Sequence, residues 1–189
     1  KDFSKKFSEL AKSLQIEWSL SDASIKFKTA IFVSKFSHCL QDLLYRASVG
    51  SLNIDINCVI SNHPDLEKIA NRYDIPFHHV PIKSNTKETA EKEMQDILAK
   101  NQIELLVLAR YMQILSDEFC EKYYGNIINI HHSFLPSFKG AKPYHQAYSK
   151  GVKILGATAH YVSAELDEGP IIEQSVDRIN HSMTPKEME

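Results

Sequence analysis

Two hydrophobic spacings alternate along most of the chain. From about residue 28 onward, short runs of β-branched and other apolar residues, typical of buried strands, are separated by stretches with an apolar residue every three or four positions, as on one face of a helix. We expect strands over residues 29–34, 52–61, 77–80, 105–109, 127–130, 154–162 and 171–176. Helices should begin near Ser37, at Asn62 with Pro64, and near Asn85, and Gly50 should end the first of them.

This order of strands and helices predicts an α/β fold. Parallel neighbours in a sheet need crossover connections, usually helices, so we expect a mostly parallel, doubly wound sheet with helices on both faces. Ligands of such sheets bind beyond the carboxyl ends of the strands. The functional site is therefore expected at that edge.

The first 25 residues follow a separate pattern. An apolar stripe from Phe3 to Leu14 has helical spacing, and apolar and polar residues then alternate over residues 16–20, as in a strand. One helix and one strand cannot bury a core of their own. We therefore expect residues 1–25 to be the end of a larger α+β unit with its linker, and residues 26–189 to form the domain that carries the site.

The last residues contain the start signal of another helix. Thr184 and Glu187 have the spacing of a capping box, and Pro185 stands at the first helical position. We expect a helix to begin there and the chain of the natural protein to continue beyond it.

Composition and charge narrow the functional classes. A length of 189 residues favours about one domain, and 43% apolar residues suffice for an ordinary core. Lys and Arg number 22 against 24 Asp and Glu, so no overall positive field attracts a nucleic acid, and no apolar run approaches the ~20 residues of a membrane span. The three cysteines show no CxxC spacing, which favours a reducing, cytoplasmic compartment.

Glycines, which mark tightly constrained backbone, and histidines, which can take part in catalysis, are concentrated between positions 125 and 169. This window holds five of the six glycines and four of the nine histidines. Asn129 and His131 are two positions apart on an expected strand, so both side chains face the same side and can address one substrate group, while His132 faces away. Acidic partners occur in the stretch 165–168. From this spacing alone, a catalytic role and a structural hydrogen-bonding role both remain open.

Metal binding is the other interpretation of a histidine-rich window. Its four histidines are His131, His132, His145 and His160. Adjacent strand residues point to opposite faces, and neither an HExxH nor a Cys/His ligand spacing occurs. We expect no metal and no cofactor.

Four ordered segments in the second half of the chain resemble the formyltransferase family, whose members use 10-formyltetrahydrofolate. These segments are NIHHSFLPSFKG at 129–140, PYHQA at 143–147, GATAH at 156–160 and LDEGPII at 166–172. Three earlier segments, at 33–44, 61–66 and 75–79, resemble the hydrolytic members of the family. Residues 3–20 resemble the last helix and strand of the small ACT domain that precedes the catalytic domain in those members.

The resemblance implies a Rossmann-like formyltransferase fold and a catalytic trio of Asn129, His131 and Asp167. In this interpretation Asn129 and protonated His131 hydrogen-bond the formyl oxygen, and Asp167 orients and deprotonates the attacking water. The products would be formate and tetrahydrofolate, which balances the one-carbon folate pool used for purine synthesis. Members of the family are homo-oligomers, so the resemblance also implies self-association.

The resemblance further implies a pterin pocket directly after the expected strand at 105–109. The pocket-lining residues would be Arg110, Tyr111, Met112, Gln113, Ile114 and Leu115. His160 would support Asp167 beside the substrate, and Gly169 would belong to the loop that closes the pocket. Without the resemblance, the apolar members of this set would be interpreted as ordinary core.

Two alternatives to hydrolysis stay open. One is formyl transfer to an amine such as glycinamide ribonucleotide; in the purine-pathway transferases a glycine-rich turn after the first strand holds the acceptor's phosphate, whereas the turn at 34–39 contains no glycine. Lys35 and the helix start near Ser37 could still bind an anion. The other alternative is a folate-binding chain without turnover. A nicotinamide-dependent dehydrogenase is disfavoured because no GxGxxG follows the first strand.

Overall fold

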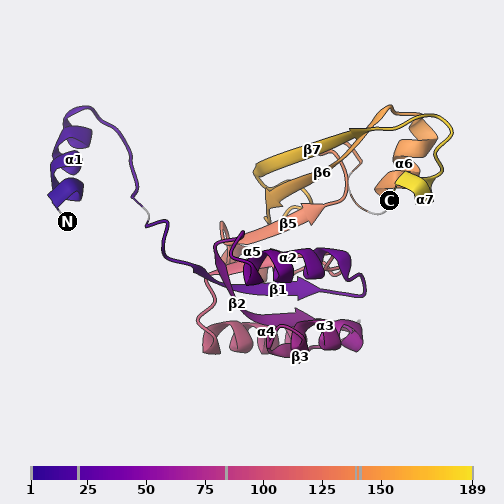
Figure 1. Ribbon diagram of the computed structural model, residues 1–189, viewed down its shortest axis with the longest axis horizontal. Coiled ribbons are helices and arrows are strands. Elements are labelled where there is room, and N and C mark those ends of the chain that lie inside the picture. The colour runs from indigo at the N-terminus through magenta and orange to yellow at the C-terminus, as the bar shows by residue number, and fades with distance from the viewer. Residues whose placement is uncertain (1, 21, 84, 139, 141, 189) are drawn as a thin grey trace.

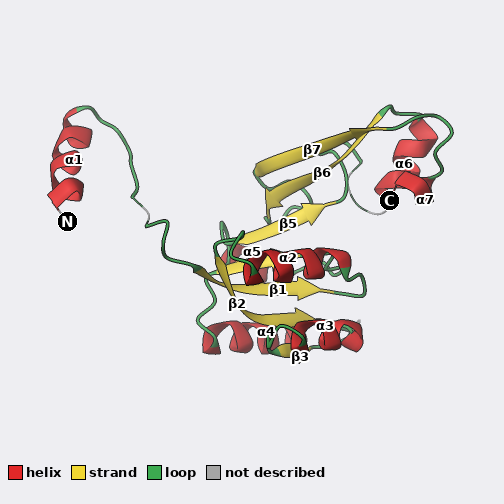
Figure 2. Ribbon diagram, in the orientation of Figure 1, coloured by secondary structure: helices red, strands yellow, loops and turns green. Residues whose placement is uncertain are grey.

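The computed structural model describes residues 2–20, 22–83, 85–138, 140 and 142–188. Figures 1 and 2 show its helices and strands along the chain. In order, these are α1 (Asp2–Ser13), β1 (Phe27–Val33), α2 (His38–Ser48), β2 (Ile54–Ser61), the 3₁₀ turn η1 (Pro64–Leu66), α3 (Glu67–Asn71), β3 (Phe77–His79), α4 (Lys87–Lys100), β4 (Leu105–Leu108), α5 (Asp117–Lys122), β5 (Ile127–His131), α6 (Pro143–Lys150), β6 (Ile154–Tyr161), β7 (Ile171–Arg178) and α7 (Pro185–Met188).

The strands form one seven-stranded sheet in the order β3-β2-β1-β4-β5-β6-β7. The first five strands in this order are parallel, whereas β6 is antiparallel to β5 and β7 is antiparallel to β6. The prediction of a mostly parallel α/β sheet is confirmed, and each of the seven expected runs contains a strand. The antiparallel pair at one edge is a feature that the pattern did not specify.

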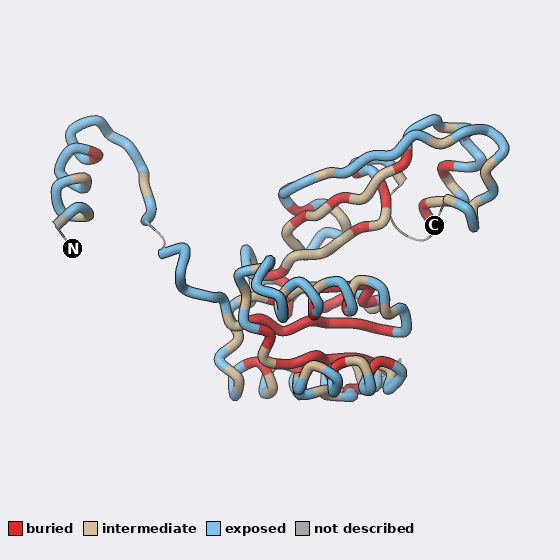
Figure 3. Tube along the Cα trace, in the orientation of Figure 1, coloured by how far each residue is buried: buried red, intermediate tan, exposed pale blue. Residues whose placement is uncertain are grey.

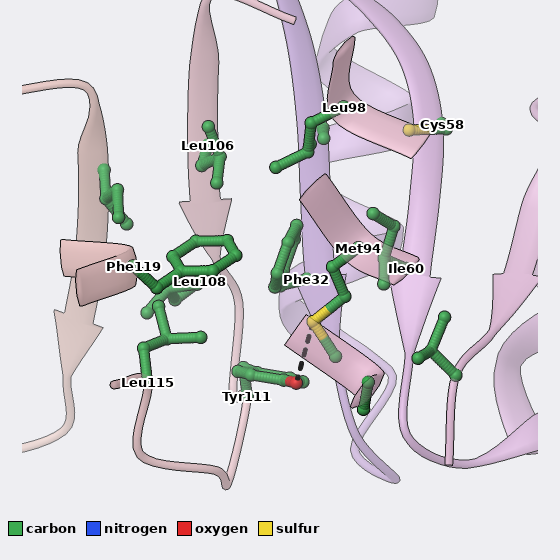
Figure 4. Packing of buried hydrophobic residues seen from close by; sticks show 14 of the residues in the cluster. Phe32, Cys58, Ile60, Met94, Leu98, Leu106, Leu108, Tyr111, Leu115 and Phe119 are labelled. Atoms are coloured by element: carbon green, nitrogen blue, oxygen red, sulfur yellow. Dashed lines mark hydrogen bonds between the residues drawn. The ribbon is translucent and has the colours of Figure 1, made fainter. Parts of the chain in front are cut away.

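Two apolar clusters, one on each face of the parallel part of the sheet, make the core. Phe32 of β1 belongs to the cluster that includes Met94 of α4 and Phe119 of α5, much of which appears in Figure 4. Ile31, one position earlier, belongs to the cluster that includes Leu40 of α2. Successive strand residues face opposite sides, so burial on both faces favours an uninterrupted apolar run, which explains the apolar residues 30–33 of β1.

The antiparallel edge is much less buried than the parallel centre. In Figure 3 the tube of β1 is red along most of its length, whereas that of β7 is largely blue. Ile171, Ile172 and Val176 of β7 are exposed. The edge that carries the β6–β7 hairpin therefore depends on strand pairing more than on a core of its own.

The expected strand over residues 16–20 is wrong. The helix α1 is present, but the residues after it form no strand, and the segment runs as an extended arm between α1 and the sheet in Figure 1. A strand needs a neighbouring strand for its backbone hydrogen bonds, and in the described part of the chain residues 16–20 have no such neighbour. The ring of Trp18 instead packs edge-on against Phe7 of α1, with 4.9 Å between ring centroids.

Helix boundaries were predicted with mixed success. The helix near Ser37 is α2. The helix expected to open at Asn62 with Pro64 begins with η1 at Pro64, whereas α4 begins at Lys87 rather than at Asn85. The capping box at the end of the chain is confirmed, since the Glu187 carboxylate accepts hydrogen bonds of 2.7 Å from both the backbone N–H and the hydroxyl of Thr184. The sequence interpretation missed α5 and α6.

Candidate active site

The last strand of the parallel part, β5, carries Asn129 and His131. The antiparallel partner of β5 is β6, and its register places His160 directly opposite Asn129. Side chains of directly opposed residues lie on the same face of a sheet, so two adjacent strands bring an amide and two imidazoles together. This explains why residues 31 positions apart in sequence form one cluster.

Asp167 approaches this cluster from the loop of the β6–β7 hairpin. Its Oδ1 atom lies 3.5 Å from Nδ1 of His131 and 3.9 Å from Nε2 of His160, and its side chain is only 6% exposed. Its other carboxylate oxygen accepts a hydrogen bond of 3.1 Å from the backbone N–H of Gly140. The backbone of Asp167 has a φ of +58°, a left-handed conformation that is uncommon outside glycine but is tolerated by Asp.

Gly169 allows the hairpin loop to fold back so closely. A Cβ atom on Gly169 would lie 1.7 Å from the carbonyl oxygen of Tyr161, at the end of β6. Gly169 belongs to the same hairpin loop as Asp167 and packs against the backbone of β6, but it is not among the residues that line the described cleft. The absence of a side chain is what brings Asp167, two residues earlier, over the sheet.

His160 is buried and its hydrogen bonds define a tautomer. Nδ1 lies 2.9 Å from the carbonyl oxygen of Tyr161, which can only accept, so Nδ1 carries the proton. Nε2 then accepts a hydrogen bond from the amide nitrogen of Asn129 at 3.2 Å. Burial lowers the pKa of His160 despite opposing contributions from Tyr161 and Asp167, which favours this neutral form.

His131 has partners at both ring nitrogens. Nδ1 faces the Asp167 carboxylate, and Nε2 lies 3.3 Å from the carbonyl oxygen of Phe138. Both neighbours are acceptors, so the doubly protonated imidazolium would satisfy both. The arrangement is therefore suited to hold a proton donor next to a carboxylate.

The cluster forms one wall of a cleft of about 400 Å³. The other walls come from the segment after β4, from the segment after β5 and from the hairpin loop. The expected site residues that line the cleft are Asn129, His131, His160, Asp167, Arg110, Tyr111, Met112, Gln113, Ile114 and Leu115. The structure thus brings together every predicted site residue except Gly169.

The six residues after β4 differ in what their side chains can do. Met112 and Ile114 are 55% and 65% exposed and form apolar lips of the cleft. Tyr111 is buried, and its ring packs edge-on against Phe32 while its hydroxyl lies 3.8 Å from the sulfur of Met94 (Figure 4). Tyr111 thus anchors the segment in the core.

A buried carboxylate that the sequence analysis missed fixes the end of this segment. Glu91 of α4 accepts a hydrogen bond of 2.8 Å from the backbone N–H of Ser116, and its second oxygen contacts the Ser116 hydroxyl. Ser116 in turn caps α5 by accepting from the N–H of Phe119. A Glu at an apolar position of a helical pattern is the only signal that could have indicated Glu91.

The turn after β1 is filled by side chains. The hydroxyl of Ser34 donates to Asn62 at 2.6 Å and accepts from the backbone N–H of Met112 at 2.9 Å. The guanidinium of Arg110 lies 4.9 Å from the ring centroid of Phe36, a cation–π contact, and Arg110 is buried. The end of the cleft next to β1 is therefore tied to β2 and β4 by a polar and aromatic network.

Metal and thiol chemistry have little support at this site. Within the described residues, no group of three or more His, Cys, Asp or Glu side chains has a metal-binding arrangement. No helix in the same part of the chain has the length and apolar character to cross a membrane. Cys120 lines the cleft, but burial is the main cause that raises its pKa, so it stays a thiol rather than a nucleophilic thiolate.

Comparison with known proteins identifies the family. The formyl transferase family model matches residues 27–189. The chain belongs to the formyl transferase family. Formyltetrahydrofolate deformylase from Corynebacterium sp. (strain P-1) is 53% identical over 182 residues, which are 96% of this chain and 64% of that relative.

Solved structures of the formyl transferase family have the same fold. A formyltetrahydrofolate deformylase from Pseudomonas syringae pv. tomato is 48% identical with a TM-score of 0.91, covering 99% of this chain and 63% of its own. A phosphoribosylglycinamide formyltransferase from Anaplasma phagocytophilum is 35% identical with a TM-score of 0.79, covering 87% of this chain and 78% of its own. The chain thus spans less than two thirds of the length of the two deformylases.

Proposed function

We propose that this protein hydrolyses 10-formyltetrahydrofolate to formate and tetrahydrofolate. The observation that carries the proposal is the 3.5 Å approach of the Asp167 carboxylate to His131, beside Asn129, in a cleft with apolar lips. Acyl transfer to water requires hydrogen-bond donors for the carbonyl oxygen and a proton acceptor for the water, and an amide, an imidazole and a carboxylate around one small cleft can supply them. The similarity to proteins named formyltetrahydrofolate deformylase over nearly the whole chain supports the same activity.

In the proposed mechanism, the formyl carbon lies between the β5 residues and Asp167. One N–H of the Asn129 amide is held by His160, and the other donates to the formyl oxygen. His131 donates from Nε2, where the formyl oxygen replaces the carbonyl of Phe138 as the acceptor. Donors aimed at this oxygen stabilise the charge that develops as the carbon becomes tetrahedral, and one such donor is worth about 3 to 4 kcal/mol.

Asp167 acts on the water in this mechanism. It accepts a proton as the water oxygen bonds to the formyl carbon, and the hydrogen bond from Gly140 holds the carboxylate in place. The tetrahedral intermediate then collapses by breaking the bond between carbon and N10. N10 gains a proton from His131 or through water, and formate and tetrahydrofolate leave. No cofactor takes part, because the folate is itself the substrate.

Water rather than an amine is the proposed acceptor because of the turn after β1. In this turn the side chains of Ser34 and Asn62 are hydrogen-bonded to each other, and the guanidinium of Arg110 lies over the ring of Phe36. This turn has no glycine whose backbone could approach a phosphate closely. Formyl transfer to an amine nucleotide is the second candidate, favoured by the shared fold with phosphoribosylglycinamide formyltransferases.

We further propose a cytoplasmic location and self-association. Cys39, Cys58 and Cys120 are free thiols, which is compatible with a reducing compartment. The exposed apolar residues of α1, among them Phe3 and Leu10, are candidates for a subunit interface.

The test is formate release from 10-formyltetrahydrofolate without an acceptor. We expect many turnovers from the unchanged protein and about a hundredfold or greater loss of kcat for Asp167→Asn, which keeps the shape but removes the proton acceptor. Glu168→Gln, at the neighbouring exposed acid, is the matched control and should keep full activity. Release that starts only on addition of glycinamide ribonucleotide would show a transferase, and a fully active Asp167→Asn protein would refute the role of Asp167.

A further inference from the structure

A further imidazole lies in the cleft, directly beside His131. His132 lines the cleft, although the alternation of a strand predicted that it would face away from Asn129 and His131. The strand β5 ends at His131, so the alternation does not continue to the next residue. The imidazole rings of His131 and His132 have their centroids 5.6 Å apart and their planes tilted by 40°. The proposed mechanism leaves this second titratable ring without a task.

The ring of His132 is held by its surroundings. Besides His131, it contacts the ring of Tyr144 of α6, with 5.5 Å between the centroids. His132 is half-buried, so its imidazole borders both the cleft and the solvent. An imidazole in such a place can take up a proton from water and give it up inside the cleft near neutral pH.

The backbone is fixed on both sides of His132 by one buried side chain of β6. His131, the residue before, pairs with Thr158 in the β5–β6 register. The Thr158 hydroxyl donates a hydrogen bond of 2.8 Å to the carbonyl oxygen of Ser133, the residue after, and accepts one of 3.0 Å from the backbone N–H of Leu135. Thr158 is fully buried. The segment that carries His132 is therefore supported in the way that a precisely placed catalytic group requires.

The reaction needs one more proton donor than the catalytic trio supplies. N10 cannot leave as an anion near neutral pH, so it must gain a proton as its bond to the formyl carbon breaks. In the proposed mechanism Nδ1 of His131 faces Asp167, and Nε2 donates to the formyl oxygen. A proton taken from Nε2 for N10 would remove the hydrogen bond to that oxygen before the intermediate has collapsed. Because this oxygen and N10 are bonded to the same carbon, an acid that serves N10 must lie beside His131.

We propose that His132 is the general acid that gives its proton to N10. This inference rests on the proposed function. The step starts from the tetrahedral intermediate, with His132 as imidazolium and with the proton from water on Asp167. The bond between the formyl carbon and N10 breaks, N10 keeps the electron pair and takes the proton of His132, and formic acid forms. The proton on Asp167 then passes through water to His132, which restores both groups, and formic acid leaves as formate with the release of one proton.

The first test is formate release by His132→Gln, which keeps a polar side chain but has no imidazolium proton to give. We expect kcat to fall about a hundredfold or more, the usual effect of losing a general acid, and KM to change little. His181→Gln, at an exposed histidine that does not line the cleft, is the matched control and should keep the kcat of the unchanged protein. An unchanged kcat in His132→Gln would overturn the proposal.

A second variant separates proton donation from packing. His132→Ala leaves a space of about the size of an imidazole beside His131, and circular dichroism checks its fold. Added imidazole, which is partly protonated near neutral pH, should raise kcat of His132→Ala in proportion to its concentration. Pyrazole has a ring of the same size but stays unprotonated there, so it should have no effect. Equal effects of imidazole and pyrazole, or no effect of imidazole, would show that the ring of His132 only packs and would overturn its role as an acid.

Failure of the proposed function gives a different result. Formate release by the unchanged protein that is matched by His132→Gln would leave hydrolysis standing and refute only the role of His132. Tetrahydrofolate release that requires glycinamide ribonucleotide would refute hydrolysis. N10 must also gain a proton in that transfer reaction, so the same two variants then test His132 with tetrahydrofolate as the measured product. No product with or without an acceptor would refute both.

Discussion

The side-chain amide of Asn129 donates a hydrogen bond of 3.2 Å to Nε2 of His160, its direct partner across the β5–β6 pair. His160 is in turn fixed by the carbonyl oxygen of Tyr161. The orientation of the Asn129 amide is therefore set by a chain of two hydrogen bonds that ends on the backbone. An amide held in this way loses little freedom when a substrate oxygen arrives, which is the condition for effective transition-state stabilisation.

Replacement of Asn129 by Ala should lower kcat for formate release by about 10² to 10³, the usual effect of removing one donor to a developing oxyanion. The fold should survive, because Asn129 is only partly buried. Asn71→Ala, at the exposed end of α3, is the control and should leave kcat unchanged. Steady-state kinetics with circular dichroism would test both, and near-normal turnover by Asn129→Ala would contradict its role.

The buried neutral His160 should make stability depend on pH. Its pKa is lowered in the folded protein, chiefly by burial, so the unfolded chain binds the proton more tightly. The contribution of this group is fully present above its unfolded pKa of about 6.5 and is lost as pH falls through the lower folded pKa. Urea unfolding between about pH 7.5 and pH 5 should show a steeper fall in the free energy of unfolding for the unchanged protein than for His160→Asn. His181→Asn, at an exposed position, should retain the steep fall, and parallel curves for all three proteins would contradict the expectation.

Gly169→Ala should damage both stability and catalysis. The added Cβ would overlap the carbonyl oxygen of Tyr161, so the loop that carries Asp167 must move away from His131. Gly125→Ala is the matched control: a Cβ there meets nothing within 4 Å, and only its φ of +78° costs free energy, about 1 to 2 kcal/mol. We expect the control to lose stability with normal kcat, and Gly169→Ala to lose kcat as well. A Gly169→Ala protein with normal kcat would show that the loop tolerates the displacement.

Glu91 should affect substrate binding from outside the cleft. Glu91→Ala leaves the N–H of Ser116 without its acceptor in a partly buried place, at a cost of about 1 to 3 kcal/mol in the free energy of unfolding. The cleft segment after β4 also loses its fixed end, so KM should rise more than kcat falls. Glu91→Gln keeps one acceptor oxygen and should recover most of both properties. Glu93→Ala, exposed on the same helix, is the control, and an equal effect of Glu91→Ala and Glu93→Ala would rule out the anchoring role.

Tyr111 should matter through its ring and not through its hydroxyl. The sulfur of Met94 is a weak acceptor, so Tyr111→Phe should change KM and stability little. Tyr111→Ala removes the ring that packs against Phe32 and should cost about 3 to 5 kcal/mol, as for other large core aromatics. Urea unfolding of the two variants separates the contributions, and a large loss of stability in Tyr111→Phe would contradict this division.

The central strands β1, β2 and β4 could be predicted because burial on both faces demands apolar runs. The short helix α6 could not, since it is bounded by left-handed residues at Lys142 and Gly151 and has few apolar positions. The strand expected over residues 16–20 failed because alternation shows that a segment could pair and not that a partner exists.

For the site, the sequence predicts local side-chain orientation but not the contacts between separate segments. The joint orientation of Asn129 and His131 follows from the two-residue period of a strand. The contact of Asn129 with His160 depends on the register between β5 and β6, and the approach of Asp167 depends on a tightly folded hairpin loop. Neither the strand register nor the fold of the loop can be predicted from the spacing of nearby residues. Only the family resemblance indicated Asp167 among the acidic residues of that loop.

The exposure of β7 has a consequence for how long Asn129, His131 and Asp167 stay together. Asn129 and His131 belong to the interior strand β5, whereas Asp167 lies in the loop of the β6–β7 hairpin, whose outer strand β7 buries little apolar surface. Segments with few buried contacts open locally at a small fraction of the global unfolding free energy. Fluctuations of this hairpin would carry the carboxylate away while the sheet and the rest of the cleft persist, so the proposed activity would depend on the stability of the least buried edge of the fold.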